Sequence, residues 1–233
     1  MTKLRVLSAG AAQAVVEKIA ADFRRDTGIE VDGEFSAVGA IRQRVLDGAP
    51  ADIIVLTAAM IDELILSGHV SPGTRADLGK VGTGVAVRSA TPVPDVASAE
   101  ALRAHLAAAT RVVCPDPATA TAGKVVMQVL ERLGLSGTVG PRMQYFPNGY
   151  AAMKWLAESR GAGEIGITQI TEIRANAGVT CAGPLPADLQ VRTVYAAGLA
   201  ARASDASARA FIERLTSLAT RKVLANAGYE FDN

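Results

Sequence analysis

The residues best suited to chemistry lie in four short turns of small and hydroxylated residues, each placed after an apolar segment. The turns begin at Ser8, Ser36, Thr57 and Asp116, and each leads into a segment with the apolar periodicity of a helix. A helix that starts in such a turn leaves several backbone N–H groups unpaired, and its dipole adds a partial positive charge. Together these features suit an anion. The pattern predicts an anion site, with an ordinary close-packed strand-to-helix turn as the alternative for each turn taken singly.

Neutral side chains in and near the turns could complete such a site. They are the hydroxyl donors Thr57, Thr119 and Thr121, and the groups that both donate and accept, Tyr145, Asn148 and Gln169. Arg42 and Arg88 are the cations that could grip a carboxylate with two parallel hydrogen bonds, and the alternative for each is a solvated surface charge.

Few side chains are candidates for acid–base work. His69 and His105 lie outside the four turns and are expected on the surface, and Asp116 is expected to brace its own Pro-Asp-Pro turn. Glu34 and Tyr145 remain as possible bases. The sequence holds no Ser/His/Asp arrangement, no phosphate-loop signature and no metal-ligand spacing. We therefore assign no catalytic residue, expect no cofactor and expect no metal.

The elements that position the first three turns follow a strand–helix repeat. Strands are expected at residues 4–7, 29–35 and 53–56, and helices at residues 11–23, 40–46 and 60–67. This order at short spacing predicts a parallel sheet with right-handed crossovers.

A second repeat is expected after a strand at residues 81–87 and a rigid break at residues 91–94. Its strands are expected at residues 111–114, 142–146 and 164–168, and its helices at residues 99–108, 124–133 and 150–159. An apolar strand at residues 191–200 is expected to return to the first repeat. One long helix then spans residues 204–227, with Ser204 as its N-cap. The candidates for its inner side are Ala208, Phe211, Leu215, Leu218 and Leu224.

The fold class is therefore α/β with two lobes, each a mixed, mostly parallel sheet flanked by helices. Residues 1–87 and 191–233 are expected to form the first lobe, and residues 88–190 the second, with the two connections acting as a hinge. In open α/β sheets a ligand lies outside the carboxyl ends of the strands. The ligand is accordingly expected in a cleft between the lobes.

Composition excludes several classes of protein. The chain has 233 residues, 49% of them hydrophobic, and a formal net charge of +1, so nothing indicates a nucleic-acid partner. Cys114 and Cys181 are expected as buried free thiols, although spacing alone leaves a disulfide open. No apolar run is long enough to span a bilayer. Lys3 leads directly into the first strand without an apolar leader, which indicates a cytoplasmic protein, or a periplasmic one if a leader has been removed.

Five motifs in this order resemble those of the molybdate-binding proteins of ABC importers, which have the type II periplasmic binding protein fold. They are Val6-Leu7-Ser8-Ala9-Gly10-Ala11, Phe35-Ser36-Ala37-Val38-Gly39, Asp47-Gly48-Ala49-Pro50-Ala51-Asp52, Asp116-Pro117 with Ala122-Gly123, and Gly166-Ile167-Thr168-Gln169. The resemblance covers nearly the whole chain, through the Gly228-Tyr229-Glu230-Phe231 ending, and the Gly-Ala-Pro-Ala-Asp piece is its most specific part.

The resemblance implies an oxyanion site of serine hydroxyls and backbone amides from the first two turns, completed by a later turn and a tyrosine. Here Gly10 and Ala11 stand where a serine is expected, and Gln169 stands where the tyrosine is expected. The four turns, the resemblance and the candidate cation Arg88 together give as ligand-binding residues Ser8, Gly10, Ala11, Gln13, Ser36, Val38, Gly39, Thr57, Arg88, Thr119, Thr121, Ala122, Tyr145, Asn148, Gly149 and Gln169. Because hydroxyl donors have been lost, the expected ligand is a small carboxylate rather than a bare tetrahedral oxyanion.

Three functions fit these features. The first is a monomeric solute receptor that binds a small anion and delivers it to an ABC permease if the chain is exported. The second is a cofactor-independent isomerase, because some relatives of the molybdate-binding group resemble aconitate isomerases, which shift a double bond in a tricarboxylic acid by moving an allylic proton. The third is a cytoplasmic sensor domain.

Overall fold

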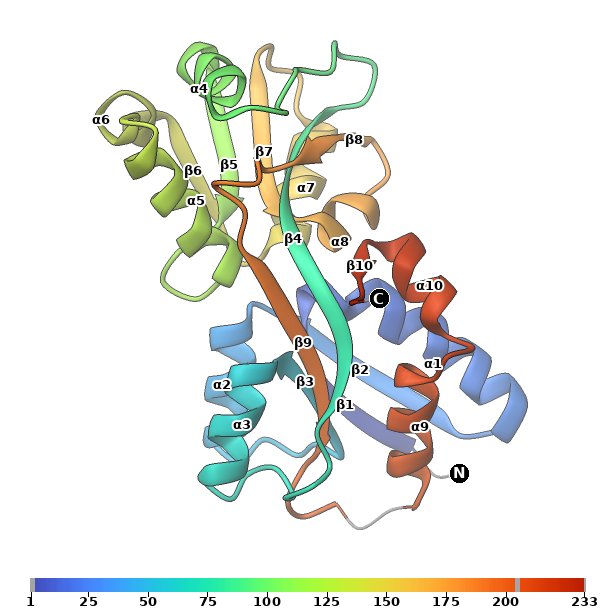
Figure 1. Ribbon diagram of the computed structural model, residues 1–233. Coiled ribbons are helices and arrows are strands. Elements are labelled where there is room, and N and C mark those ends of the chain that lie inside the picture. Colours follow the sequence, from blue (N-terminus) through green and yellow to red (C-terminus); the bar gives the residue numbers. More distant parts are fainter. Residues whose placement is uncertain (1–2, 204–205, 233) are drawn as a thin grey trace. The chain divides into compact units, whose positions relative to one another are not determined.

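The computed structural model describes residues 3–203 and 206–232 and divides the chain into two compact units (Figure 1). The first unit comprises Met1–Val81 and Thr193–Asn233, and the second comprises Gly82–Arg192. The chain passes from one to the other inside the long strand β4 (Ala76–Arg88) and returns at the start of β9 (Arg192–Leu199). Ser204, the expected N-cap, lies outside the described residues.

The first unit is built from the expected strand–helix repeat. Its elements up to β4 are β1 (Lys3–Ala9), the 3-10 turn η1 (Gly10–Ala12), α1 (Gln13–Thr27), β2 (Glu30–Ser36), α2 (Val38–Leu46), β3 (Ile53–Thr57) and α3 (Ala58–Leu66). β1 pairs in parallel with both β2 and β3, and β9 pairs antiparallel to β3. The short β10 (Tyr229–Glu230) pairs antiparallel to the first part of β4. The expectation that the late apolar strand returns to this unit is confirmed.

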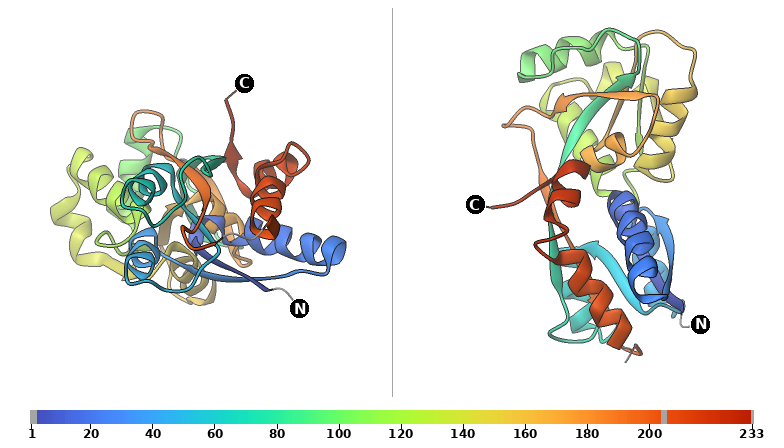
Figure 2. Two further views of the ribbon diagram at one scale, coloured as in Figure 1. Left: turned by 90° about the horizontal axis from the view of Figure 1, so that it is seen from below. Right: turned by 90° about the vertical axis from the view of Figure 1, so that its right-hand side faces the viewer.

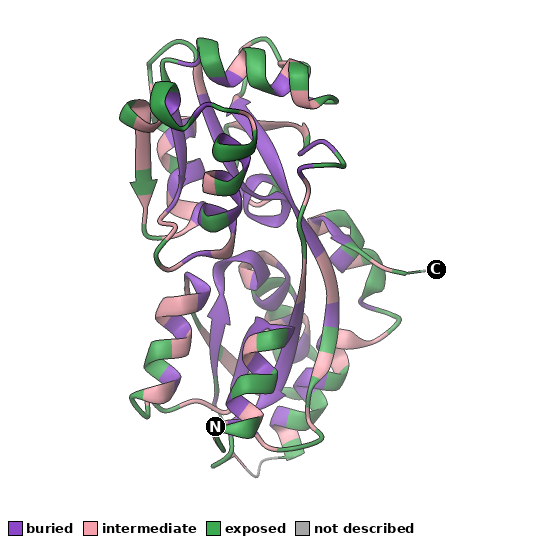
Figure 3. Cartoon of the chain, turned by 60° about the vertical axis from the view of Figure 1, so that its left-hand side comes forward, coloured by how far each residue is buried: buried purple, intermediate pink, exposed green. Residues whose placement is uncertain are grey.

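Helices cover both faces of the first unit's sheet. α2 and α3 lie on one face, and α1 lies on the other with α9 (Ala206–Thr216) and α10 (Arg221–Ala227), which pack against it (Figures 1 and 2). Phe23 of α1 and Phe211 of α9 meet edge to face, with ring centroids 5.3 Å apart. The central strands β1, β3 and β9 are mostly buried, β2 is not, and the outer faces of the helices are exposed (Figure 3).

The prediction of one long C-terminal helix is wrong, because hydroxyl groups interrupt it between α9 and α10. Thr220 and Ser217 both donate from their side chains to the carbonyl of Arg214. These bonds occupy a carbonyl that a continuous helix would use. Leu218 falls in the interruption and is 81% exposed, so it is not part of the inner side.

The second unit also alternates strands and helices around a mixed sheet. Its elements after β4 are α4 (Ala99–Ala108), β5 (Arg111–Pro115), α5 (Thr121–Arg132), α6 (Ser136–Val139), η2 (Gly140–Arg142), β6 (Met143–Phe146), α7 (Gly149–Glu158), β7 (Glu164–Gln169), α8 (Ile170–Arg174) and β8 (Val179–Pro184). β5 pairs in parallel with β6 and β7, whereas β4 pairs antiparallel to β7 and β8. The mixed sheet flanked by helices is thus confirmed in both units.

Strand β8 was not expected from the sequence. It is short, and its pairing with β4 shifts register between Val85 and Ala86. Its partner β4 lies far away in the chain, so the local hydrophobic periodicity does not predict this strand.

The second unit has an apolar cluster on each face of its sheet. Val85 and Ile167 pack with α4 and α5 on one face, whereas Ala86 and Val113 pack with α7 and α8 on the other. Cys114 and Cys181 are free, as expected. Cys114 is buried, and burial beside Asp116 raises the pKa of its thiol to about 12. Cys181 is only half-buried, which corrects the expectation for that residue.

Among residues 3–203 and 206–232, no helix combines the length and the apolar character that a membrane crossing requires.

The Gly-Ala-Pro-Ala-Asp motif has a structural role in the first unit. The Asp52 carboxylate accepts from the backbone N–H of Arg5 at 2.7 Å, and its own N–H donates to the Arg5 carbonyl at 2.9 Å. The Asp52 carbonyl accepts from the N–H of Ala200 at 3.0 Å. This one residue therefore joins the beginnings of β1 and β3 to the end of β9.

We predict that Asp52→Ala lowers the free energy of unfolding by about 1–2 kcal/mol, because the Arg5 N–H loses a charged acceptor. Thermal unfolding followed by circular dichroism measures the change. Asp47→Ala is the matched control, since that carboxylate only accepts from the Gln43 side chain at the surface, and its effect should stay within about 0.5 kcal/mol. Equal losses in the two variants would contradict the joining role.

Candidate functional site

Three of the predicted turns lie at one edge of the first unit's sheet. In the register of the parallel strands, Ser8 lies beside Phe35 and Val55, and Ala9 lies beside Ser36. The carboxyl ends of β1, β2 and β3 therefore lie at the same level of the sheet. The elements η1, α2 and α3 begin at this edge. The structure brings the three turns together, as the sequence predicts.

In the first turn, the side chains already have partners within the chain. Ser8 is fully buried, and its hydroxyl donates to the Ala9 carbonyl at 3.1 Å. Gln13 donates to Glu17, one turn further along α1, at 3.0 Å. Gly10 and Ala11 are buried in the 3-10 turn and bring no hydrogen-bonding side chain. The turn can offer a ligand its backbone rather than its side chains.

The other two turns differ in how their helices begin. The Thr57 hydroxyl accepts from the backbone N–H of Met60 and thereby caps α3. α2 begins after Ala37 with no side-chain cap, with Val38 buried and Gly39 half-buried in its first turn. The first N–H groups of α2 are consequently the ones that lack an acceptor from a side chain.

A second set of turns lies at one edge of the second unit's sheet. Pro115 pairs with Phe146, and Val113 pairs with Gly166, so β5, β6 and β7 end at a common edge. The Asp116 carboxylate accepts from the N–H of Ala118 at 2.8 Å, which confirms that it braces its own turn. α5 then begins after Ala120 with no side-chain cap.

The predicted residues of the α5 turn surround this uncapped start. Thr119 and Thr121 are half-buried and Ala122 is buried. The helix begins very close to the end of β5, because a Cβ on Gly123 would overlap the Pro115 carbonyl. A glycine here lets the helix start approach the strand.

Tyr145 and Asn148 occupy different surroundings. Tyr145 is 44% exposed, and its hydroxyl donates to the Met127 sulfur on α5 at 3.5 Å; burial raises the pKa of its phenol. The Asn148 side chain accepts from the N–H of Ala151 at 2.8 Å and caps α7. One oxygen of Asn148 is thus used by the fold, while its NH2 group has donors left.

The start of α7 already holds an anion-forming group that belongs to the protein. Glu172 is buried, and its carboxyl accepts from the Thr168 hydroxyl at 2.5 Å and from the N–H groups of Gly149, Tyr150 and Gln169. Burial raises the pKa of Glu172, and these four donors oppose that shift. The backbone donors of Gly149 and Tyr150 are therefore engaged by Glu172, although the sequence predicted Gly149 as a ligand residue.

Gly149 gives Glu172 the space it needs. A Cβ on Gly149 would overlap both the Glu172 carboxyl and the Thr168 hydroxyl. The glycine is thus explained by close packing against a buried carboxyl group rather than by a turn with positive φ.

Six buried polar atoms of this unit have no hydrogen-bond partner. They are the side-chain nitrogen and oxygen of Gln169, the hydroxyls of Thr83 and Thr171, and, near the beginning of β7, Arg88 Nε and one carboxylate oxygen of Glu164. Gln169 is only 2% exposed and Thr83 is fully buried. Each such atom costs about 1–3 kcal/mol if nothing pairs with it.

The two candidate arginines lie apart from these turns. Arg42 pairs with Glu63 on α3 at 3.3 Å. Arg88 donates to the Gly161 carbonyl at 3.3 Å and lies near the beginning of β7, whereas Gln169 ends that strand. The structure does not group Arg88 with the other ligand candidates of its unit.

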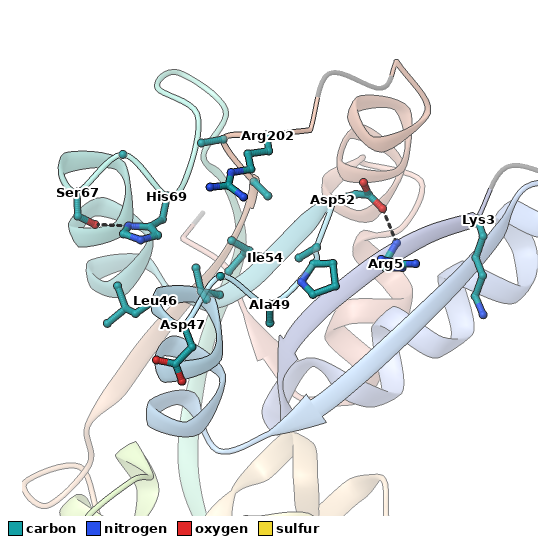
Figure 4. Close-up of a pocket in the computed structure, with 17 residues that line it drawn as sticks. Lys3, Arg5, Leu46, Asp47, Ala49, Asp52, Ile54, Ser67, His69 and Arg202 are labelled. Atoms are coloured by element: carbon teal, nitrogen blue, oxygen red, sulfur yellow. Dashed lines mark hydrogen bonds between the residues drawn. The ribbon is translucent and has the colours of Figure 1, made fainter.

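The acid–base candidates are also dispersed. Glu34 forms an ion pair with Arg44, and His105 lines a pocket with Arg88. His69 bonds to the Ser67 hydroxyl at 3.1 Å in a pocket of about 660 Å³ on the first unit (Figure 4). That pocket is lined by Lys3, Asp52 and neighbours at the beginnings of β1 and β3, the edge opposite the predicted turns. In the described ranges, no three His, Cys, Asp or Glu side chains gather to hold a metal ion.

Sequence reasoning missed Glu172, Thr83 and Gln190. Gln190 accepts from the Thr83 N–H and donates to the Thr83 carbonyl, both at 2.8 Å, in the manner of an extra strand. The one available signal was a glutamate four residues after Thr168 within the apolar run of residues 165–173. Nothing local marks the other two.

We predict that Gly149→Ala lowers the free energy of unfolding by about 3 kcal/mol, because the new methyl group overlaps the buried Glu172 carboxyl. Gly137→Ala is the matched control, since nothing lies within 4 Å of its Cβ position in α6, and it should be neutral or stabilise by up to about 1 kcal/mol. Chemical denaturation measures both. A mild effect at Gly149 would show that the Glu172 pocket has room to spare.

The raised pKa of Glu172 predicts a pH dependence. Above the ordinary value of 4.5 the unfolded chain releases the Glu172 proton while the folded chain retains it, so the free energy of unfolding falls as pH rises until the folded pKa is passed. Glu172→Gln cannot titrate and lacks this component. Denaturant unfolding between about pH 4 and pH 8 should show wild type losing stability relative to Glu172→Gln as pH rises. Parallel curves would mean that the hydrogen-bond donors cancel the effect of burial.

Comparison with known proteins places this geometry in context. A family model described as bacterial extracellular solute-binding protein matches residues 4–230. An aconitate isomerase from Pseudomonas sp. is 27% identical over 241 residues, covering 98% of this chain and 87% of that protein. The molybdate-binding protein ModA of Escherichia coli K12 is 20% identical, covering 97% of this chain and 88% of that protein.

Among solved structures, the periplasmic molybdate-binding protein of Azotobacter vinelandii superposes with a TM-score of 0.82 at 22% identity, covering 99% of this chain and all of that one. The expected periplasmic binding protein fold is confirmed, as is the resemblance to molybdate-binding and aconitate-isomerase-like proteins. The match over nearly the whole length is decisive for the family: this chain belongs to the bacterial extracellular solute-binding proteins.

Proposed function

We propose that this chain binds a small anion, an organic carboxylate in the first place and a molybdate-like oxyanion in the second. The observation that carries the proposal is the pair of helix starts, α2 in the first unit and α5 in the second, that have no side-chain cap at the carboxyl edge of their sheets. Unpaired N–H groups at the positive end of a helix favour a negatively charged ligand. The ligand residues of the proposal are those predicted from the sequence, except Arg88, which lies apart from the turns, and Gly149, whose N–H is engaged by Glu172.

A carboxylate is preferred because hydroxyl donors are scarce at these edges. The Ser8 and Thr57 hydroxyls already take part in hydrogen bonds within the chain. A compact dianion needs a donor at almost every oxygen, and each missing donor costs about 1–3 kcal/mol. Each carboxylate group has only two charged oxygens, and the apolar body that carries it can contact buried residues such as Ala11 and Val38.

The biological role that fits is a receptor that carries its anion to an ABC permease. As a receptor it would act outside the cytoplasmic membrane, in keeping with the family to which it belongs, and it would be a monomer by our proposal.

A second function, isomerisation of a small unsaturated polycarboxylate, is favoured by one observation. The aconitate isomerase relative is 27% identical to this chain, whereas the E. coli molybdate-binding relative is 20% identical. The reaction would need a base that moves an allylic proton and donors that stabilise the resulting anion. The uncapped helix starts could supply the donors, and no base is assigned.

We predict that a small carboxylate at about 100 times its Kd stabilises the protein by about 2.7 kcal/mol, which raises the melting temperature by about 5–10 °C. The panel is citrate, cis-aconitate, trans-aconitate, molybdate, tungstate and sulfate. Gly39→Asp and Thr121→Asp each put a carboxylate into the first turn of α2 or α5 and should weaken binding at least about tenfold by repulsion. Ser136→Asp, at the exposed start of α6, is the control and should bind normally.

An Asp in the first turn also suits the helix dipole, so the unliganded variants should melt close to wild type. Absence of any stabilising anion would contradict the proposal, and unchanged affinity in one variant would remove that helix start from the site. Incubation with trans-aconitate, followed by NMR without added cofactor, separates the two functions. Conversion to the cis isomer would establish the enzyme, and binding without conversion would favour the receptor.

A further inference from the structure

Two unpartnered side chains lie on one face of the second unit's sheet. Thr83 of β4 and Gln169 of β7 are direct partners in an antiparallel pair, so their side chains point to the same face. The Thr83 N–H and carbonyl bond to Gln190 on the other side of the strand. Thr83 and Gln169 are thus a non-hydrogen-bonded pair, in which side chains approach most closely.

The face they share is the one covered by α5. Side chains alternate along a strand, so Gln169 points the same way as Ile167, and Thr83 the same way as Val85. Ile167 and Val85 belong to the apolar cluster formed with α5. Thr168 points the opposite way, toward Glu172. Gln169, at the end of β7, and Thr83, within β4, therefore lie on the face of the sheet that α5 covers, and α5 begins without a side-chain cap.

The fold does not use the polar atoms of this pair. The Gln169 nitrogen, the Gln169 oxygen and the Thr83 hydroxyl are all buried without a hydrogen-bond partner. Glu172 cannot serve them, because its carboxyl already accepts from Thr168 and three backbone groups. Buried polar groups in native proteins are almost always paired, so these atoms indicate a partner from outside the chain.

The chemistry of the three atoms restricts that partner. The Gln169 nitrogen only donates and its oxygen only accepts, whereas the Thr83 hydroxyl does both. A fully ionised carboxylate or oxyanion only accepts, so it would leave the Gln169 oxygen unpaired. An alcohol hydroxyl donates to the Gln169 oxygen and accepts from the Thr83 hydroxyl or the Gln169 nitrogen.

We propose that Gln169 and Thr83 recognise an alcohol hydroxyl on the ligand, next to a carboxylate held by the start of α5, so that the preferred ligand class is a hydroxycarboxylate. This inference rests on the proposed function, because it specifies the carboxylate that the site selects. It assigns a role to Thr83, which no sequence motif marks, and it gives the glutamine at position 169 a selective function.

Two pairs of acids that differ by one hydroxyl test the inference. Citrate is compared with tricarballylate, and malate with succinate, by isothermal titration calorimetry on the full chain. The hydroxylated acid of each pair should bind at least about tenfold more tightly, the effect of one hydrogen bond to otherwise unpaired groups. Gln169→Met and Thr83→Val should each reduce that preference to about twofold or less.

Matched controls separate recognition from folding. Gln128→Met and Thr138→Val make the same changes at exposed positions of α5 and α6 and should keep the preference. Thr83→Val removes a buried unpaired hydroxyl, so the unliganded variant should melt at or above the wild-type temperature. A clear fall in melting temperature would indicate a structural hydroxyl and overturn the role of Thr83.

The remaining outcomes are distinct. If tricarballylate, succinate or molybdate binds as tightly as the hydroxylated acids, the hydroxyl inference is overturned while anion binding stands. If neither these acids nor the oxyanions bind, the proposed function itself fails. A preference that survives in Gln169→Met also overturns the assignment.

Discussion

A helix begins with several backbone N–H groups that need acceptors, and the way this chain supplies them determines where its chemistry can occur. Thr57 caps α3, Ser98 caps α4 and Asn148 caps α7. Among the helices that begin with no side-chain cap, α2 and α5 begin at the carboxyl ends of β2 and β5, so no side chain accepts from their first N–H groups. Because in-register parallel strands place these starts at the carboxyl edges of their sheets, the uncapped helices lie where α/β proteins bind ligands.

At the start of α7, the buried carboxyl of Glu172 is the acceptor for the first backbone N–H groups. Its carboxyl sits at the start of α7, where a ligand anion could otherwise bind, and it joins α7 to the β7–α8 junction through four donors. Such a group is costly to bury without partners, which explains why Gly149 must be a glycine and why Thr168 faces it. The consequence is that the first N–H donors of α7 are engaged within the second unit, whereas those of α5 have no side-chain acceptor.

Unlike Glu172, the side chains of Gln169 and Thr83 have no hydrogen-bond partner within the chain. They are as buried as the core, yet the fold gives their polar atoms nothing to bond. The side chain of Thr168 donates to Glu172 within the fold. The next residue, Gln169, faces the other side of the sheet, and its side-chain nitrogen and oxygen have no hydrogen-bond partner. The alternation of a β-strand thus separates the structural role of Thr168 from the binding role that we propose for Gln169.

The sequence by itself determined the strand–helix repeats, the turns and the family resemblance, because apolar periodicity, small-residue turns and motif order are local properties. It also identified Asp116 as the brace of its turn, since an Asx turn needs only neighbouring residues. It failed where hydroxyls at Ser217 and Thr220 broke a helix whose apolar pattern continued. Only the tertiary structure decided which N–H groups are occupied and which polar atoms are left over. Those facts depend on pairs such as Gly149 with Glu172, Thr83 with Gln190 and Thr83 with Gln169, whose members are far apart in the chain or belong to different elements and meet only through strand register and helix packing.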